Sequence, residues 1–249
     1  MRTSLNLVAA LLLLPAWANA QATHVPLESG AGLHLHNVSA TSATLLGRKG
    51  VRIELSDETR KKLQAMTPEE QQRAAAQGLG EQLAVIEQSS FGDGVIEAEI
   101  AGAPRPDAGE GARGFVGIAF RMQDDLKTYD AFYLRPTNGR ADDQVRRNHS
   151  TQYISHPDFP WFRLRKEFPE KYEAYVDLVP GEWTKVRIEV RGATARLFVH
   201  GQAQPTLIVS DVKSGATGKG KIALWIEGST IGHFRNLTVT PAAPAAPAR

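Results

Sequence analysis

The chain has 249 residues, a formal net charge of +2 and no cysteine. A charge so close to zero argues against a protein that binds nucleic acid through a broad basic surface. The lack of cysteine excludes disulfides and a lipid anchor on cysteine. Such a chain must be held together by its hydrophobic core, and about two hundred residues suffice for one β-sandwich domain.

The first twenty residues have the features of a secretory signal peptide. Arg2 supplies a positive start, the run LVAALLLLPAWA is apolar, and Ala18-Asn19-Ala20 has the form of a small-x-small cleavage site. This apolar run is too short to span a membrane, and no later run is long enough to do so. We expect cleavage near Ala20, a secreted or periplasmic mature protein, and a disordered Ala/Pro-rich tail over 241–249.

Most of the remaining chain alternates apolar and polar residues, which is the period of half-buried β-strands. The segment 114–122 is apolar on both faces, as expected of a strand deep in a two-sheet sandwich. We therefore predict an all-β fold with two antiparallel sheets. Strands are expected over 95–100, 114–121, 129–135, 183–190, 194–199, 221–226 and 234–239. The predicted core consists of Ile96, Ile100, Ile118, Phe120, Phe132, Leu134, Val186, Ile188, Leu197, Val199, Ile222 and Leu224.

One segment, 56–80, departs from this pattern because it is rich in helix-forming residues. Within it, Thr67-Pro68-Glu69-Glu70 has the form of a capping box with proline at the first helical position, so a helix is expected to begin there. Its apolar stripe is thin, which is typical of a surface helix inserted between two strands. The alternative interpretation is a flap over a binding face.

Two segments, 129–136 and 161–168, combine aromatic residues with arginines. If both are strands, alternation turns these side chains to the non-core face of a sheet. Arginine binds carboxylates and vicinal hydroxyls, and Trp and Tyr rings match the C–H face of a sugar. The alternative is a network of surface ion pairs that contributes little to stability. The predicted carbohydrate-binding residues, with their neighbours in the chain, are Tyr133, Arg135, Arg146, Arg147, Tyr153, Trp161, Arg163, Arg165 and Glu167.

Four segments also suggest a family. They are FGDGVIEAEI, GFVGIAFRMQDDLKTYDAFYLRPTNG, GEWTKVRIEVRGATARLFVHG and GKIALWIEGSTIGHFRNLTV. In this order they resemble the strands of concanavalin A-like lectin/glucanase domains, in the laminin-G-like and 3-keto-disaccharide hydrolase-like branches, over about residues 33–240. The resemblance implies a jelly roll of two curved antiparallel sheets, with ligand on the concave face or at the loop rim. It also implies that the final strand returns beside the N-terminal one.

The resemblance has consequences for catalysis. Retaining glucanases of this fold carry Glu-x-Asp-x-x-Glu on one strand, and this chain has no such triplet. The 3-keto-disaccharide hydrolase-like branch implies removal of a proton next to a sugar carbonyl instead. His149 and His156 are the candidate bases, because they flank Tyr153 and lie near Arg146 and Arg147. The alternative is that both are inert, hydrogen-bonded residues of a rim loop.

Acidic residues in the loops around 129–136 suggest a calcium site. Hard cations bind carboxylate oxygens, and Asp142 and Asp143 are the candidate ligands for Ca²⁺. The alternative is that these adjacent acids form a solubilising turn.

Three functions therefore remain open. The leading hypothesis is an exported protein that binds an oligo- or polysaccharide. The second is a glycoside hydrolase or lyase acting on a modified glycoside, with His149 or His156 as base. The third is a protein-interaction module of the laminin-G type. Fold analogy alone does not choose among them.

Overall fold

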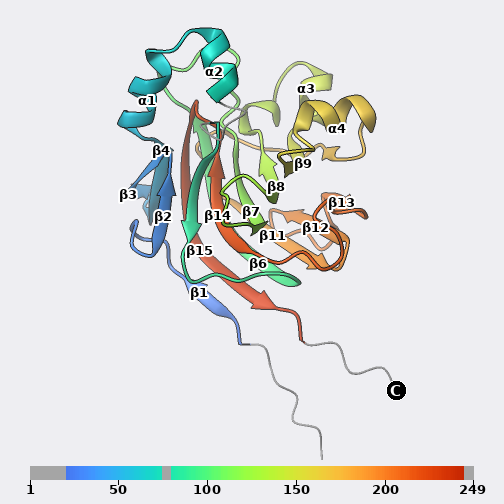
Figure 1. The fold of residues 1–249 in the computed structure, drawn as a ribbon. Helices are drawn as coiled ribbons and strands as arrows, with labels where there is room; N and C mark the ends of the chain where they lie inside the picture. The colour runs from blue at the N-terminus through green and yellow to red at the C-terminus, as the bar shows by residue number, and fades with distance from the viewer. Residues whose placement is uncertain (1–20, 75–79, 244–249) are drawn as a thin grey trace, which may run out of the picture.

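The structure is a computed structural model that describes residues 21–74 and 80–243. The predicted signal peptide over 1–20 and the tail residues 244–249 lie outside the described residues. Within the described ranges, strands dominate and form two antiparallel sheets that stack face to face (Figure 1). The prediction of an all-β sandwich with a helical insertion is confirmed. None of the helices described is both long and apolar enough to span a membrane.

The first sheet, called sheet A, has eight strands among the described residues. In spatial order they are β13 (Leu207–Val209), β12 (Thr194–Val199), β11 (Thr184–Arg191), β6 (Gly94–Pro104), β15 (Thr230–Pro241), β4 (Arg48–Leu55) and β3 (Val38–Leu45), with β1 (Thr23–Val25) also paired to β15. Thr23 lies opposite Val239. The final strand therefore returns beside the N-terminal one, as the resemblance implied.

The second sheet, called sheet B, has seven strands among the described residues. In spatial order they are β10 (Glu173–Ala174), β9 (Thr151–His156), β8 (Tyr129–Leu134), β7 (Val116–Met122), β14 (Lys221–Ile226), β5 (Gln82–Ile86) and β2 (Leu33–His36). Strand β7 is buried throughout, as its two apolar faces predicted.

The alternation in the sequence decides which side chains meet between the sheets. In β11, Val186, Ile188 and Val190 are buried, whereas Lys185 and Arg191 are exposed. Every residue predicted for the core is at most 2 % exposed. Burial of this apolar surface is the main source of stability in a chain that has no disulfide.

The helices lie outside the two sheets (Figure 1). They are α1 (Asp57–Gln64), α2 (Pro68–Ala74), α3 (Gln144–Asn148) and α4 (Trp161–Glu167), with a short 3-10 turn over Pro136–Asn138. The predicted capping box is present at the start of α2. Glu70 accepts the backbone N–H of Thr67 at 2.8 Å, and Thr67 Oγ1 accepts the N–H of Glu70 at 3.3 Å. A role of α1 and α2 as a flap stays a prediction.

The prediction of a strand over 161–168 is wrong, because most of this segment is helix α4. Pro160 precedes the helix with a φ of −69°. Proline has no N–H for a strand ladder but suits the start of a helix. Leu164 is fully buried and anchors the helix. The helical period places Trp161 beside Arg165, four residues later.

We predict that Ile188→Ala lowers the free energy of unfolding by about 2–5 kcal/mol, because the residue is 1 % exposed and its removal leaves a cavity. Urea unfolding followed by tryptophan fluorescence measures the loss. Arg191→Ala, an exposed position on the same strand, is the control and should change stability by no more than about 0.5 kcal/mol. Equal effects of the two substitutions would mean that the register of β11 is wrong.

Candidate functional site

The outer face of sheet B carries a row of residues that pair across neighbouring strands. The row crosses five strands, β14, β7, β8, β9 and β10, and each residue pairs with the next. In this order the residues are Trp225, Gly117, Tyr133, Gln152 and Glu173. Directly paired residues point to the same side of a sheet. We call the surface that they define the site face. It points away from sheet A, because its residues alternate with those that fill the core.

Gly117 lets two aromatic rings meet in the middle of this row. A Cβ at this position would lie only 2.5 Å from the Cβ of Tyr133. The rings of Tyr133 and Trp225 lie with their centroids 4.8 Å apart. Two neighbouring rings, both buried, therefore occupy the middle of the site face, with polar groups towards β9 and β10.

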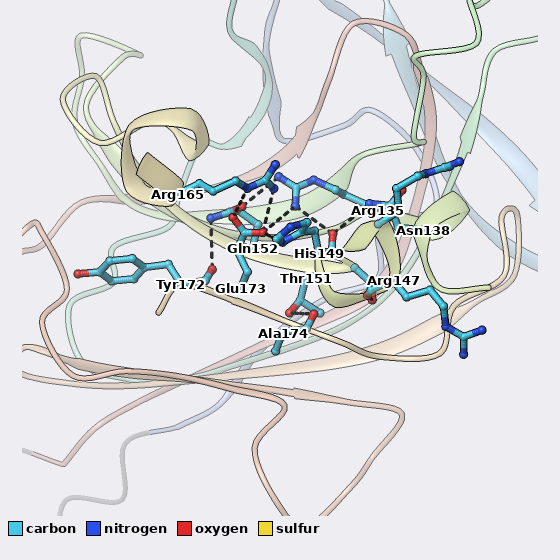
Figure 2. A network of polar contacts seen from close by, with 12 residues as sticks. Arg135, Asn138, Arg147, His149, Thr151, Gln152, Arg165, Tyr172, Glu173 and Ala174 are labelled. Atoms are coloured by element: carbon cyan, nitrogen blue, oxygen red, sulfur yellow. Dashed lines mark hydrogen bonds and ion pairs between the residues drawn. The ribbon is translucent and has the colours of Figure 1, made fainter. Parts of the chain in front are cut away.

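The carboxylate of Glu173 is the centre of the polar network in Figure 2. Arg165 donates two hydrogen bonds to it, from Nε to Oε1 and from Nη2 to Oε2, both at 2.8 Å. Arg135 Nη1 lies 3.8 Å from Oε2, and His149 Nδ1 contacts the same oxygen. The side chain of Glu173 is only 3 % exposed. Two guanidiniums thus balance a carboxylate that is removed from water.

Arg135 holds the backbone of His149 in place. Its Nη1 donates to the carbonyl of His149 at 2.9 Å, and its Nη2 donates to Tyr133 Oη at 2.7 Å and to Gln152 Oε1 at 3.0 Å. Asn138 Nδ2 donates to the same His149 carbonyl at 3.2 Å. The histidine is therefore fixed at its backbone by two donors and at its ring by Glu173.

His149 lines a pocket of about 240 Å³ together with Glu173 and Tyr175. Burial lowers the pKa of His149 below its usual 6.5, and Arg165 and Arg135 act in the same direction against the charge of Glu173. The ring is therefore neutral at pH 7. Because a carboxylate only accepts hydrogen bonds, its contact with Nδ1 favours the tautomer that carries the proton there and leaves a lone pair on Nε2.

Exposed aromatic surface adjoins this network. The ring of Trp161 has Arg165 Cζ at 4.8 Å and Arg135 Cζ at 5.8 Å from its centroid. Trp161 is 40 % exposed, and its neighbour Phe162 is 61 % exposed. These rings offer a sugar a flat apolar surface beside the charged groups.

The structure thus brings Arg135, His149, Trp161 and Arg165 together, but in an environment that differs from the expected one. Tyr133 and Arg135 were expected on an exposed face and are only 1 % and 4 % exposed. The expectation of exposure is wrong, because neighbouring rings cover both side chains. Burial also raises the pKa of Tyr133 to about 12, so its hydroxyl stays protonated.

The prediction that Tyr153 contacts a ligand on this face is contradicted. Tyr153 lies opposite Phe132 in register, so its ring points between the sheets, where it is fully buried. Its hydroxyl donates to Asp130 Oδ1 at 2.5 Å. The residue stabilises the core instead.

Four other predicted residues lie on the surface around the site. Arg163 Nε donates to Glu167 Oε1 at 2.8 Å along α4, an ordinary surface pair of the kind considered as the alternative. Arg146 and Arg147 are in α3. Arg147 lies over the ring of Tyr175, with its Cζ 5.2 Å from the centroid.

His156 belongs to a second cluster on the site face. Its Nδ1 lies 2.8 Å from Glu81 Oε1 and 3.1 Å from Tyr129 Oη. Tyr129 Oη also contacts Glu81 Oε2 and accepts a hydrogen bond from Trp225 Nε1 at 3.0 Å. His156 ends β9, whereas His149 precedes it. The extended strand between them separates the two histidines, so they do not act on one bond.

Sequence reasoning did not assign Glu173, Gln152 or Glu81 to the site. A signal was present in YEAYVD, where an acid stands between apolar residues of a segment rich in arginine. Glu81 and His156 are 75 positions apart in the chain, so no local sequence pattern predicts their contact.

The predicted calcium ligands are adjacent to helix α3. Asp143 Oδ1 accepts the backbone N–H of Arg146 at 3.1 Å and so caps that helix. Across residues 21–74 and 80–243, no three His, Cys, Asp or Glu side chains gather in a way that could hold a metal ion. Calcium binding by Asp142 and Asp143 stays a prediction.

We predict that Glu173→Ala lowers the free energy of unfolding by about 3–5 kcal/mol, because it leaves the buried cation of Arg135 without a counter-charge. Denaturant unfolding measures the loss. Glu167→Ala removes a carboxylate of the same type from an exposed pair and should cost about 0–1 kcal/mol. If both substitutions cost the same small amount, the Glu173 network is not a buried one.

We also predict that the ring of His149 titrates below pH 6.5, since burial and two arginines outweigh Glu173. Proton NMR of the ring measures the midpoint, and His149→Gln identifies the signal by its loss. The pKa is lower in the folded state, so His149 contributes stability above pH 6.5 that is lost as the pH falls through the folded pKa. A midpoint at or above 6.5 would show that the charge of Glu173 dominates.

Comparison with known structures finds similar β-sandwich folds. The carbohydrate-binding module CBM66 from Bacillus subtilis is 12 % identical, with 83 % of this chain and 97 % of the module covered and a TM-score of 0.50. A protein of galectin-like fold from Bacillus subtilis is also 12 % identical, with coverage of 89 % and 96 % and a TM-score of 0.51. At this identity the likeness shows the fold alone.

Comparison at the level of sequence is more specific. No curated protein matches the chain. A family model described as a 3-keto-alpha-glucoside-1,2-lyase-like domain matches residues 54–240, which confirms the resemblance to the 3-keto-disaccharide hydrolase-like branch. The matched residues include both histidine clusters of the site face. Strand β2 of sheet B precedes the matched residues. The chain belongs to the family of 3-keto-alpha-glucoside-1,2-lyase-like domains.

Proposed function

We propose that the protein is an enzyme that eliminates the alcohol from a 3-oxo-glycoside, with His149 as the base. The observation that carries this proposal is a histidine held by Glu173 at the wall of a pocket, with Arg165 paired to the same carboxylate. Sugar binding alone needs no neutral base, whereas proton removal does. The family to which the chain belongs supports the choice of a 3-oxo-glucoside as substrate.

The proposed reaction begins with transfer of the proton on C2, between the C3 carbonyl and the anomeric carbon, to Nε2 of His149. The electron pair of the C–H bond moves to the carbonyl oxygen, and the guanidinium of Arg165 stabilises the resulting enolate. The carbonyl then forms again as the bond from C1 to the glycosidic oxygen breaks. The leaving oxygen takes the proton from His149, so the products are an unsaturated 3-oxo sugar and an alcohol.

Other residues prepare His149 for this step. Glu173 keeps the proton on Nδ1, so the lone pair of Nε2 is available to the substrate. Arg135 and Asn138 hold the backbone carbonyl. Trp161, which is partly exposed beside Arg165, supplies a surface for the sugar ring.

The second candidate function is carbohydrate binding without turnover, the leading hypothesis from the sequence. The exposed rings of Trp161 and Phe162 favour it, because aromatic faces bind sugars without any need for a base. Export to the periplasm or the cell exterior is part of both proposals and depends on the signal-like segment over 1–20.

Turnover of nitrophenyl 3-oxo-α-glucoside, followed by release of nitrophenol, tests the proposed function. We predict that His149→Gln lowers kcat/KM by about 10²–10⁴-fold, the usual loss when a general base is removed. His24→Gln is the control, since His24 lies exposed on β1 of the other sheet. Its kcat/KM should equal that of the wild type.

Two results would contradict the enzyme proposal. One is full activity of the His149→Gln protein. The other is a wild-type protein that binds the 3-oxo-glucoside in calorimetry but releases no alcohol. Binding without release, weakened by Trp161→Ala, would establish the second candidate function instead.

A further inference from the structure

A groove of about 890 Å³ lies on the outer face of sheet A, on the opposite side of the sandwich from the site face. In its floor, Lys185, Glu99 and Arg235 lie opposite one another on β11, β6 and β15. They point outward because they alternate with core residues such as Ile100. The register of three neighbouring strands therefore sets the floor of the groove, and Glu28, Gly47 and His200 from loops and turns complete its lining.

A tryptophan lies in this groove in a fixed orientation. Trp183 Nε1 donates to the backbone carbonyl of Leu45 at 3.0 Å. The ring rests over Gly50 of β4, where a Cβ would lie 3.1 Å from the ring edge. Arg235 Cζ lies 5.8 Å from the ring centroid. Trp183 remains partly exposed, so it offers a preset aromatic surface, as saccharide sites do.

The charge of the groove is positive and incompletely balanced. Besides Lys185 and Arg235 it contains Arg48 and Lys49, against the acids Glu28 and Glu99. Glu99 is already engaged by Arg48, forms an ion pair with Arg235 at 3.6 Å, and accepts a hydrogen bond from Asn236 at 3.0 Å. Among the described residues, Lys49 and Lys185 have no ion-pair partner. These ammonium groups are available to an anion.

We propose that this groove binds an acidic saccharide, a chain of sugars that carry carboxylates. The face of Trp183 receives a sugar ring, and Lys49 and Lys185 pair with its carboxylates. A neutral sugar would leave the cations unused. A nucleic acid would need a broad basic surface, whereas the net charge of the chain is only +2. This binding is independent of the elimination proposed for the site face.

Isothermal titration calorimetry with tetragalacturonate tests the proposal, with maltotetraose as the neutral saccharide. The groove variant is Lys49→Glu combined with Lys185→Glu. The control is Lys61→Glu combined with Lys127→Glu, which makes the same change of charge on α1 and in the turn after β7. We expect tetragalacturonate to bind the wild type and the control alike, and the groove variant at least about tenfold more weakly.

A second variant distinguishes a saccharide site from a general anion site. Trp183→Leu should weaken binding of tetragalacturonate, and a hexaglutamate peptide should bind the wild type far more weakly than tetragalacturonate does. Equal binding of hexaglutamate would overturn the saccharide assignment in favour of an acidic peptide. Absence of tetragalacturonate binding, or equal losses in the groove and control variants, would overturn the site. The lysine variants decide this even if Trp183→Leu does not fold.

Discussion

The arrangement of the site face depends on the balance of charge around Glu173. A carboxylate removed from water is costly unless cations and donors surround it. Here Arg165 comes from α4 and Arg135 follows β8, so the requirement ties a helix and two strands together. The same carboxylate orients His149. One electrostatic need therefore determines both the position of α4 and the state of the candidate base.

The two outer faces of the sandwich differ in the burial and pairing of their charged side chains. On the site face, charged groups are buried and paired, so they interact in a low dielectric. Burial, together with Arg165 and Arg135, lowers the pKa of His149 there. In the groove on sheet A, the ammonium groups of Lys49 and Lys185 are exposed and lack an ion-pair partner among the described residues. Exposed charges are screened by salt and suit reversible binding. The first arrangement favours chemistry, and the second favours attachment to a charged ligand.

The residues of the site could be found from the sequence more readily than their arrangement. The density of arginine and aromatic residues led to His149, Trp161 and Arg165, which do lie together. The prediction that residues 161–168 alternate along a strand was wrong, because Pro160 and the buried Leu164 favour a helix in this segment. In a helix of seven residues, the helical and strand periods are hard to separate. Tyr153 was misplaced because its strand was not predicted, so its face was unknown.

The sequence by itself determined the all-β class, the core positions and the capping box that begins α2. These features depend on period-two alternation and on hydrogen bonds between residues three positions apart. Both involve only residues that are close together in the sequence. Only the tertiary structure decided that Glu173 is buried among cations, that Glu81 meets His156, and that Lys185, Glu99 and Arg235 form one row. Such contacts depend on the register between strands distant in the chain. Burial then decides how strongly their charges interact, and neither property can be read from neighbours in the sequence.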